Sequence, residues 1–295
     1  MEKIENKNLV SAIITTYNRP LKILKRALNS VLNQTYPNIE IILINACPEN
    51  KNLSYEIKEY TEMLPNINYV CLDKNSLAGK ARNEGIKYSK GKYIAFLDDD
   101  DEWIENKIEL QVNKFEHSSK KLGIVYSSFY EIKSGKKNKV VSFSNKEGYV
   151  LNDLLKYNII GGTSIPMLLK EALINIGGFD EKFPSSQDYD VWINICKNYE
   201  IGYINKPLIK YYVTDDAITR DMQKRIKGWN MIENKYKDLY GENKNSYNCF
   251  LNMIAQQLLL NKNRNWKEYY KRALKVKIFS LENLKIFKTV LKMFL

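Results

Sequence analysis

Short apolar runs alternate with helical patterns along the first 115 residues. Four of these runs are β-branched, lack polar alternation and span six to nine residues, which predicts strands buried on both faces. A segment with helical spacing follows each run, so the region predicts repeated β-α units around a mostly parallel sheet. The predicted strands are residues 9–17, 39–46, 67–72 and 92–97, and the predicted helices are residues 21–32, 53–63, 78–88 and 104–115.

Polar side chains stand where these predicted strands end. Thr15 and Tyr17 close the first strand, Asn45 closes the second, and the run Asp98–Asp101 closes the fourth. Because ligands gather at the carboxyl ends of parallel strands, we expect these side chains to line one binding edge. Four adjacent carboxylates repel one another unless a cation lies among them or water reaches all of them. A solvated acidic loop is the alternative, but the strand-end position favours a metal site.

The ligand types in this acidic run indicate which metal it would hold. The run offers only carboxylate oxygens, with no His or Cys beside it. Such hard ligands suit Mg²⁺ or Mn²⁺, and Mg²⁺ is usually held by one or two carboxylates together with substrate phosphates. The pattern therefore predicts a nucleoside diphosphate as ligand, with the metal neutralising the charge of the diphosphate as a Lewis acid.

Composition narrows the class of protein. At 295 residues, 44% of them hydrophobic, the chain suits one large domain or one domain with an appendage. Its four cysteines lie far apart, which argues against a disulfide framework or a zinc site, and the single His117 has no second histidine for a metal site. No apolar run reaches the roughly eighteen residues of a membrane span and the N-terminus lacks a signal-peptide core, so we expect a cytoplasmic protein.

The net charge of +12 is concentrated at the C-terminal end of the chain. Residues 1–219 carry 29 Lys and Arg against 28 Asp and Glu, whereas residues 220–295 carry 17 against 6. A balanced body with a basic tail predicts a catalytic domain followed by a segment that meets an anionic partner. We therefore place a catalytic domain at residues 1–215 and a basic helical region at residues 216–295.

Three segments of the body resemble the family 2 glycosyltransferases. They are "IITTYNRP" (13–20), "AGKARNEGIKYSKGKYIAFLDDDDEW" (78–103) and "GGFDEKFPSSQDYDVWINI" (177–195), and the resemblance covers about residues 8–215. It implies an inverting enzyme with the GT-A fold, which has a Rossmann-like, mostly parallel α/β sheet flanked by helices. It also implies a nucleotide-sugar half at about 8–103, an acceptor half at about 104–215, a divalent metal and an acceptor hydroxyl.

The resemblance assigns donor-binding roles to residues of the first half. Thr15 and Tyr17 match positions that border the nucleotide base, and Arg82 matches an arginine near the base and diphosphate. Asn45 stands where the family usually has the first Asp of a "DDGS" motif, which here reads "NACP". An Asn side chain both donates and accepts, so pairing with uracil stays possible and a UDP-sugar is expected. Lys80 lies on the same cationic side, and for both basic residues a solvated helix position is the alternative.

The acidic run matches the Asp-x-Asp motif of the family. The alignment makes Asp100 the metal ligand, while Asp98 would meet the ribose or a metal-bound water and so counts as both a donor and a metal residue. Asp99 occupies the variable position of this donor motif. Asp101 and Trp103 are expected to shape the sugar pocket, with Trp103 on the acceptor side.

An inverting transfer needs one base to take the acceptor proton. The resemblance assigns this role to Asp188, the Asp of an "ED" motif whose first residue is here Gln187. The missing negative charge would leave the pKa of Asp188 lower than in an ED pair. The alternative is that Asp188 only occupies the first turn of a helix, where the helix dipole favours an acid.

Further residues of the second half are candidates for acceptor binding. Gly162 belongs to a glycine pair that either brings backbone close to a ligand or makes a tight turn. Asp190 is expected to bond the acceptor, and Trp192 either packs in the core or floors the sugar site. Asn194 replaces an arginine that is common in the family.

The last segment predicts a basic amphipathic helix. Such a helix binds the anionic cytoplasmic leaflet or packs on its own domain, and both readings stay open here. Membrane binding would place the enzyme on the inner face of the plasma membrane, with a lipid-linked glycan of a bacterial surface polysaccharide as acceptor. The apolar positions are Leu284, Phe287, Leu291 and Phe294, and the lysines of the other face are Lys285, Lys288 and Lys292.

Two other classes of protein fit parts of the pattern. A sugar nucleotidyltransferase also uses a carboxylate-held metal, but it would need a glycine-rich loop after the first strand, where "TTYNRPLK" has no glycine. A basic nucleic-acid-binding module would use Trp266, Tyr269 and Tyr270 among the basic residues of the tail. That reading leaves a metal site at the strand ends unexplained, so no nucleic acid is expected as partner.

Overall fold

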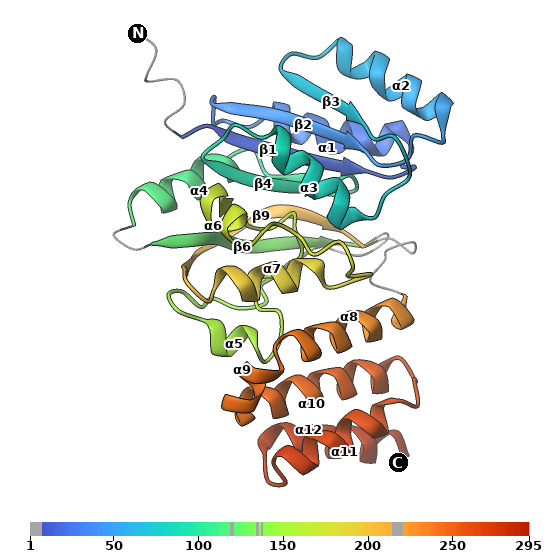
Figure 1. The fold of residues 1–295 in the computed structure, drawn as a ribbon, viewed down its shortest axis with the longest axis vertical. Helices are drawn as coiled ribbons and strands as arrows, with labels where there is room; N and C mark the ends of the chain where they lie inside the picture. The colour runs from blue at the N-terminus through green and yellow to red at the C-terminus, as the bar shows by residue number, and fades with distance from the viewer. Residues whose placement is uncertain (1–7, 119–120, 134–135, 137, 214–220, 295) are drawn as a thin grey trace.

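One mixed sheet organises the catalytic body (Figure 1). The computed structural model describes residues 8–118, 121–133, 136, 138–213 and 221–294, with backbone only for 291–294. Within these residues the strand order is β3-β2-β1-β4-β8-β6-β9-β5, and β7 pairs with β6. The strands are β1 (Val10–Thr16), β2 (Ile39–Asn45), β3 (Ile67–Cys71), β4 (Tyr93–Asp98), β5 (Glu102–Trp103), β6 (Leu122–Ile132), β7 (Lys139–Val141), β8 (Met167–Leu169) and β9 (Glu200–Tyr212).

The four predicted strands are confirmed as β1 to β4, and they pair with one another in parallel. Residues of β1 and β4 are almost all buried, as a sheet covered by helices on both faces requires. The register sets Thr15 opposite Asp98 on one side and Thr16 opposite Asn45 on the other. Three neighbouring strands therefore end at the same level, which brings the polar side chains to one edge of the sheet, and ligand binding at this edge stays a prediction.

Helices follow these strands close to the predicted positions, as α1 (Leu21–Leu32), α2 (Lys51–Glu62), α3 (Ala78–Tyr88) and α4 (Lys107–Glu116). The predicted start of the last helix at residue 104 is wrong. The Ile104 backbone N–H donates to the Leu208 carbonyl, and β5 pairs with β9 just before it. A long-range strand pairing thus binds Ile104, residues 105 and 106 form a turn, and the helix begins three residues later than periodicity predicts.

The acceptor half adds three short helices, α5 (Leu151–Leu154), α6 (Lys170–Asn175) and α7 (Gln187–Ile195). Its strands β6, β8 and β9 continue the sheet beyond β4, with β8 antiparallel to both β4 and β6. This antiparallel strand lies between the donor and acceptor parts of the sheet. It brings the segment before it, residues 161–166, next to the end of β4.

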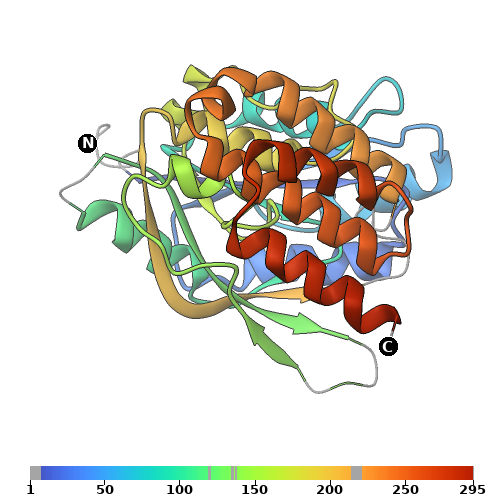
Figure 2. The same cartoon turned by 90° about the horizontal axis from the view of Figure 1, so that it is seen from below.

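Five further helices form the C-terminal region: α8 (Met222–Lys235), α9 (Lys237–Glu242), α10 (Lys244–Leu260), α11 (Trp266–Val276) and α12 (Leu281–Phe294). They stack below the acceptor half and away from β2 and β3 (Figures 1 and 2). Contacts with Asp190 of α7 join this region to the rest of the molecule: Lys235 Nζ lies 2.8 Å from Asp190 Oδ2, and the Tyr236 hydroxyl donates to Asp190 Oδ1 at 2.7 Å. The predicted boundary near residue 215 lies outside the described residues.

The predicted C-terminal helix is confirmed as α12, and its packing is now defined. Asn283 and Ile286 are buried against the preceding helices, whereas Leu284 and Phe287 are each more than half exposed. The side chains of Leu291, Lys292 and Phe294 lie outside the described residues. None of the helices within the described residues is both long and apolar enough to span a bilayer.

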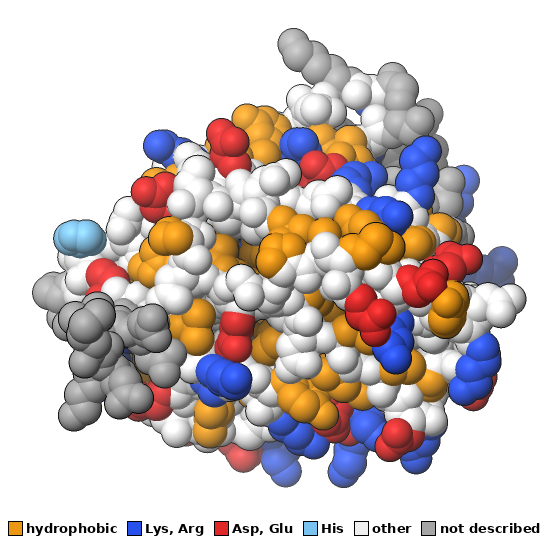
Figure 3. Space-filling model, turned by 90° about the horizontal axis from the view of Figure 1, so that it is seen from above, with side chains coloured by type: hydrophobic (Ala, Val, Ile, Leu, Met, Phe, Trp, Pro, Cys, Tyr) orange, Lys and Arg blue, Asp and Glu red, His pale blue; other side chains and the backbone are white. Residues whose placement is uncertain are grey.

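Charged side chains of both signs are interspersed on the upper face of the molecule (Figure 3). This face belongs to the end that carries β2, β3 and α2, which we call the donor end. The mixture of signs agrees with the balanced composition of residues 1–219. The basic excess lies instead with the helices at the opposite end of the molecule.

Candidate active site

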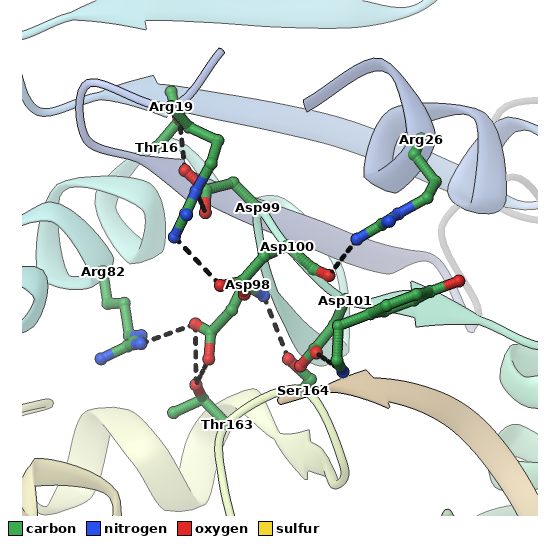
Figure 4. A network of polar contacts seen from close by, with 11 residues as sticks. Thr16, Arg19, Arg26, Arg82, Asp98, Asp99, Asp100, Asp101, Thr163 and Ser164 are labelled. Carbon is green, nitrogen blue, oxygen red and sulfur yellow. Dashed lines mark hydrogen bonds and ion pairs between the residues drawn. The ribbon is translucent and has the colours of Figure 1, made fainter. Parts of the chain in front are cut away.

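The four carboxylates at the end of β4 point in different directions, and arginines lie between them (Figure 4). Asp98 Oδ1 accepts a hydrogen bond from Arg82 Nη2 at 2.7 Å, and the Thr163 hydroxyl donates to the same carboxylate at 3.1 Å. The Asp98 backbone N–H donates to Ser164 Oγ at 3.1 Å. Segment 161–166 therefore holds Asp98 from one side and α3 holds it from the other.

Arg19 joins the next two carboxylates. Its Nε donates to Asp99 Oδ1 at 2.9 Å, and its Nη2 donates to Asp100 Oδ2 at 3.0 Å. The Thr16 hydroxyl donates to the other oxygen of Asp99 at 2.7 Å. Burial raises the pKa of Asp99, while Arg19 and Thr16 oppose that shift. Asp99 thus faces β1 and anchors Arg19, whose second nitrogen is presented to Asp100.

Asp100 is the more accessible member of this pair. Its side chain is 20% exposed, against 8% for Asp99. Burial, together with the charges of Asp98 and Asp99, raises the pKa of Asp100 to about 6. A carboxylate whose ionised form is disfavoured in this way gains from any cation brought beside it.

Asp101 lies in the protein interior, where its contacts support the fold. It is fully buried, accepts from the Tyr212 backbone N–H at 3.2 Å and bonds Ser164, and burial raises its pKa well above the usual range. Trp103 is buried beside it, and its Nε1 donates to the Ser164 carbonyl at 3.2 Å. The buried Lys107 ammonium lies 4.3 Å from the centre of the Trp103 ring. These contacts link the end of β4 to β9 and to segment 161–166.

The residues present fit a divalent metal held jointly with a diphosphate. Among the described residues no three His, Cys, Asp or Glu side chains converge into a ready-made metal site. Asp98 and Asp100 do remain partly exposed at the edge, and Mg²⁺ or Mn²⁺ needs only one or two carboxylates when phosphates complete its shell. The buried Arg82 Nε has no hydrogen-bond partner, so it is a free donor for a phosphate oxygen at the same edge.

Asp188 lies in the first turn of α7, across Arg82 from Asp98. Arg82 Nη1 donates to Gln187 Oε1 at 3.2 Å, and the same guanidinium binds Asp98. Burial raises the pKa of Asp188 to about 6; the charge of Asp98 adds to the shift, while Arg82 opposes it. A carboxylate with this pKa is largely ionised at pH 7 and basic enough to accept a proton.

Known proteins resemble this chain in sequence and in fold. A family model, "Glycosyl transferase family 2", matches residues 11–177. This chain is a family 2 glycosyltransferase. It is 31% identical over 228 residues to the Escherichia coli enzyme WfgD, "UDP-Glc:alpha-D-GlcNAc-diphosphoundecaprenol beta-1,3-glucosyltransferase", covering 76% of this chain and 85% of that one. It is 28% identical over 222 residues to the Bacillus subtilis "putative teichuronic acid biosynthesis glycosyltransferase TuaG", covering 75% and 85% of the two chains.

Solved structures show the fold of this glycosyltransferase. Staphylococcus aureus TarS residues 1–349, in complex with UDP-GlcNAc, superposes with a TM-score of 0.66 at 17% identity, covering 94% of this chain and 78% of that one. The GT-A fold with C-terminal helices is thereby confirmed, while the family match confirms the predicted enzyme class. The family has homologues in polysaccharide biosynthesis, such as TuaG.

The other residues predicted to bind the donor lie at the same edge but differ in accessibility. Tyr17 is 55% exposed, while Thr15 and Lys80 are half-buried. Asn45 is buried, its Nδ2 donates to Ser54 Oγ at 2.9 Å, and its Oδ1 accepts from a backbone N–H at 3.0 Å. The side chain of Asn45 thus binds its own surroundings, and contact with a base stays a prediction.

The predicted acceptor residues of the glycosyltransferase are mostly buried. Trp192 is fully buried and donates from Nε1 to the Gly161 carbonyl at 2.9 Å. Asp190 is buried, and its carboxylate binds Lys235 and Tyr236 of the C-terminal region. Gly162 faces open space, where an added Cβ would meet no atom within 4 Å. Contact with an acceptor stays a prediction for all three positions, and only at Gly162 is the adjoining space open.

Sequence reasoning missed several residues that build this site: Arg19, Arg26, Thr163, Ser164 and Asn158, whose Nδ2 donates to Asp188 Oδ2 at 3.4 Å. Arg26 donates to the Asp100 carbonyl and stacks 3.6 Å from the centre of the Tyr212 ring. It also lines a cavity of about 930 Å³ between α1 and β5, on the side of the acidic run away from Arg82. The segments "YNRP" and "GGTS" did carry a signal, because they adjoin the predicted strand end and the glycine pair.

Proposed function

We propose that this glycosyltransferase transfers a sugar, with inversion, from a UDP-sugar to a hydroxyl of a glycan acceptor. One observation carries the proposal: a single guanidinium, Arg82, binds both the donor carboxylate Asp98 and residue Gln187 beside the base. A donor sugar held at Asp98 would therefore lie next to Asp188. The uridine nucleotide is supported by the UDP-Glc in the name of WfgD and the UDP-GlcNAc bound to TarS.

The donor would be held by the carboxylates and arginines of the edge. We assign Asp100 and Asp98 as the residues that hold Mn²⁺ or Mg²⁺; when bound, the metal supplies Lewis-acid neutralisation of the leaving diphosphate. Arg82 offers its unpartnered Nε to a phosphate oxygen. Tyr17, which is exposed directly after β1, would cover the base.

Asp188 would act as general base on the acceptor. The acceptor oxygen forms its bond to the anomeric carbon while the bond from that carbon to the diphosphate oxygen breaks. The bonding electrons leave with UDP, and the acceptor proton passes to Asp188. A base with a pKa of about 6 is ionised at neutral pH and matched to a proton transfer that occurs during the attack.

The acceptor we propose is a lipid-linked glycan of a bacterial surface polysaccharide, presented on the inner face of the plasma membrane. The support is the diphosphoundecaprenol acceptor in the name of WfgD and the teichuronic acid pathway in the name of TuaG. Gly162, beside Thr163, leaves room for an acceptor to approach the edge.

A donor screen tests the proposal. Nucleotide release is measured for UDP-, GDP- and dTDP-sugars with and without Mn²⁺, and a diphosphoundecaprenol-linked sugar is offered as acceptor. We expect UDP release that requires Mn²⁺ and increases with the acceptor. Release from another nucleotide class would refute the uridine assignment. Formation of pyrophosphate in a separate reaction that offers UTP and a sugar 1-phosphate would instead indicate a nucleotidyltransferase.

A further inference from the structure

The turn between α11 and α12 and the start of α12 carry a cluster of exposed apolar side chains. Ile278 and Phe279 in the turn are 67% and 90% exposed, and Leu281, Leu284 and Phe287 on the helix are 76%, 54% and 53% exposed. We call these five residues the hairpin patch. Single exposed apolar residues are common, but five within ten positions mark an interaction surface.

A buried polar network holds the turn in this conformation. Asn283, which is only 3% exposed, donates from Nδ2 to the carbonyls of Lys277 at 2.6 Å and Ile278 at 2.9 Å. Its Oδ1 accepts from Asn252 Nδ2 of α10 at 2.7 Å. Buried amides are costly unless they are hydrogen-bonded, so these bonds specify one path for the turn. Ile278 and Phe279 are therefore held outward by the fold.

The exposed apolar residues are not those that α12 uses for packing. Ile286 is 1% exposed and packs on the core with Val290, and the Tyr270 hydroxyl donates to the Asn283 carbonyl at 3.2 Å. Leu281 and Leu284, three positions apart, lie on a different face. A helix that is apolar on a second, solvent-facing side has more apolar surface than its own fold buries.

Lysines surround the hairpin patch. Between residues 271 and 288 the chain has six basic residues and one acid, Glu282, which pairs with Lys285 at 3.0 Å. Exposed lysines among exposed apolar side chains suit an anionic lipid surface, because the lysines meet headgroups while the apolar groups enter the acyl boundary. A second copy of the chain would set lysines against lysines in a two-fold contact, which disfavours self-association.

The position of the patch is compatible with an acceptor supplied from a membrane. In Figure 1 the donor end, α7 and the C-terminal helices follow one another from top to bottom, and Figure 2 views α12 from below. A surface bound beneath the C-terminal helices is therefore nearer to α7 than to the donor end.

We propose that the hairpin patch docks this protein peripherally on an anionic lipid surface. The patch shares Leu284 and Phe287 with the stripe predicted from the sequence, but it is centred on Ile278, Phe279 and Leu281, which that stripe leaves out. Docking concerns a surface remote from the acidic run and is tested without the transfer reaction. Its failure would leave the proposed donor, base and acceptor chemistry untouched.

Vesicle co-sedimentation of the full chain tests this proposal. The probes are vesicles of phosphatidylcholine mixed with phosphatidylglycerol and vesicles of phosphatidylcholine alone. We expect binding to the mixed vesicles that weakens with added salt. The double variant Ile278→Ser/Phe279→Ser should bind them on the order of tenfold or more weakly, because it loses the two most outward apolar side chains of the turn. Lys285→Ser/Lys288→Ser should show a similar loss, with the hairpin patch intact.

Matched controls separate docking from general effects. Met63→Ser removes a side chain that is 75% exposed at the donor end, and Leu260→Ser removes one that is 61% exposed at the other end of α10. Both should bind vesicles like the parent protein. Melting temperature and UDP affinity should be unchanged in every variant. Equal binding of the Ile278→Ser/Phe279→Ser variant would overturn the proposal, and so would a concentration-dependent dimer, seen by light scattering, that this variant abolishes.

Discussion

The acidic run and the C-terminal helices both concentrate charge of one sign, but they differ in how far that charge is buried and paired. At the end of β4 four carboxylates lie among Arg19, Arg26 and Arg82, and their burial raises the pKa of several of them. Around the hairpin patch six basic residues face one acid, and most of the lysines are exposed. Charge that is paired and partly buried suits chemistry, whereas an excess of exposed charge of one sign suits an external partner of the opposite sign.

Substitution of the base gives the largest expected effect on the chemical side of this comparison. Asp188→Asn should reduce transfer roughly 10²-fold or more and leave UDP affinity near that of the parent, because the amide cannot accept the acceptor proton. Initial rates and calorimetry measure the two quantities. Asp238→Asn, which changes an acid in the first turn of α9, is the control for a simple helix-dipole role. Transfer at the parent rate in Asp188→Asn would show that another residue is the base.

Loss of the proposed metal ligand is the next largest effect. Asp100→Ala should reduce Mn²⁺-dependent UDP binding by about tenfold or more, because one of two exposed carboxylates at the edge is lost. Calorimetry with Mn²⁺ and with EDTA checks this, and Glu102→Gln, which changes an acid two positions further along the chain, is the control. UDP affinity that is the same in the variant, or in EDTA, contradicts the metal assignment.

The raised pKa of Asp188 predicts a pH profile. The base is active when ionised, so kcat/KM should be level above about pH 6 and fall about tenfold per pH unit below it. Asp188→Asn should lose this acidic limb. A limb that persists in the variant would belong to another group, such as Asp100, whose pKa is also raised to about 6.

The arginine between the carboxylates should contribute to stability. Arg19→Met leaves Asp99 without its cation and should lower the free energy of unfolding by about 1–3 kcal/mol. Urea unfolding measures this at neutral pH. In the double variant with Asp99→Asn the added cost should be smaller, because no unpaired buried carboxylate remains. Strictly additive costs would mean that the pair is not coupled.

Truncation before Leu281 should have the smallest effect on the site. The cut removes buried Ile286 and Asn283, so we expect a melting temperature lower by several degrees and UDP affinity within about twofold of the parent. Vesicle binding should be lost, because the cut removes three of the five hairpin-patch residues together with Asn283, whose bonds hold Ile278 and Phe279 outward. A truncated protein that keeps its vesicle affinity but melts earlier would mean that α12 serves only the fold.

Local sequence pattern was sufficient to predict the parallel strands β1 to β4 and the edge of the sheet at which they end. The runs that form β1 to β4 are short, β-branched and continuously apolar. Both faces of such a strand must be buried, which a sheet covered by helices on both sides provides. The strand ends then placed Asp98 near Thr15 without further information, and the motif resemblance supplied Asp188.

Only the tertiary structure decided which charges meet. Arg19 and Arg82 lie 81 and 16 positions from their carboxylate partners in the acidic run, and Arg26 lies 74 positions from the Asp100 carbonyl that it binds, so no local pattern signals these contacts. The late start of α4 has the same cause, since β5 pairs with a strand about a hundred residues later. In the tail, periodicity identified an amphipathic helix, but which apolar side faces α10 depends on Asn252 and Asn283, whose bonds exist only once two helices are packed together.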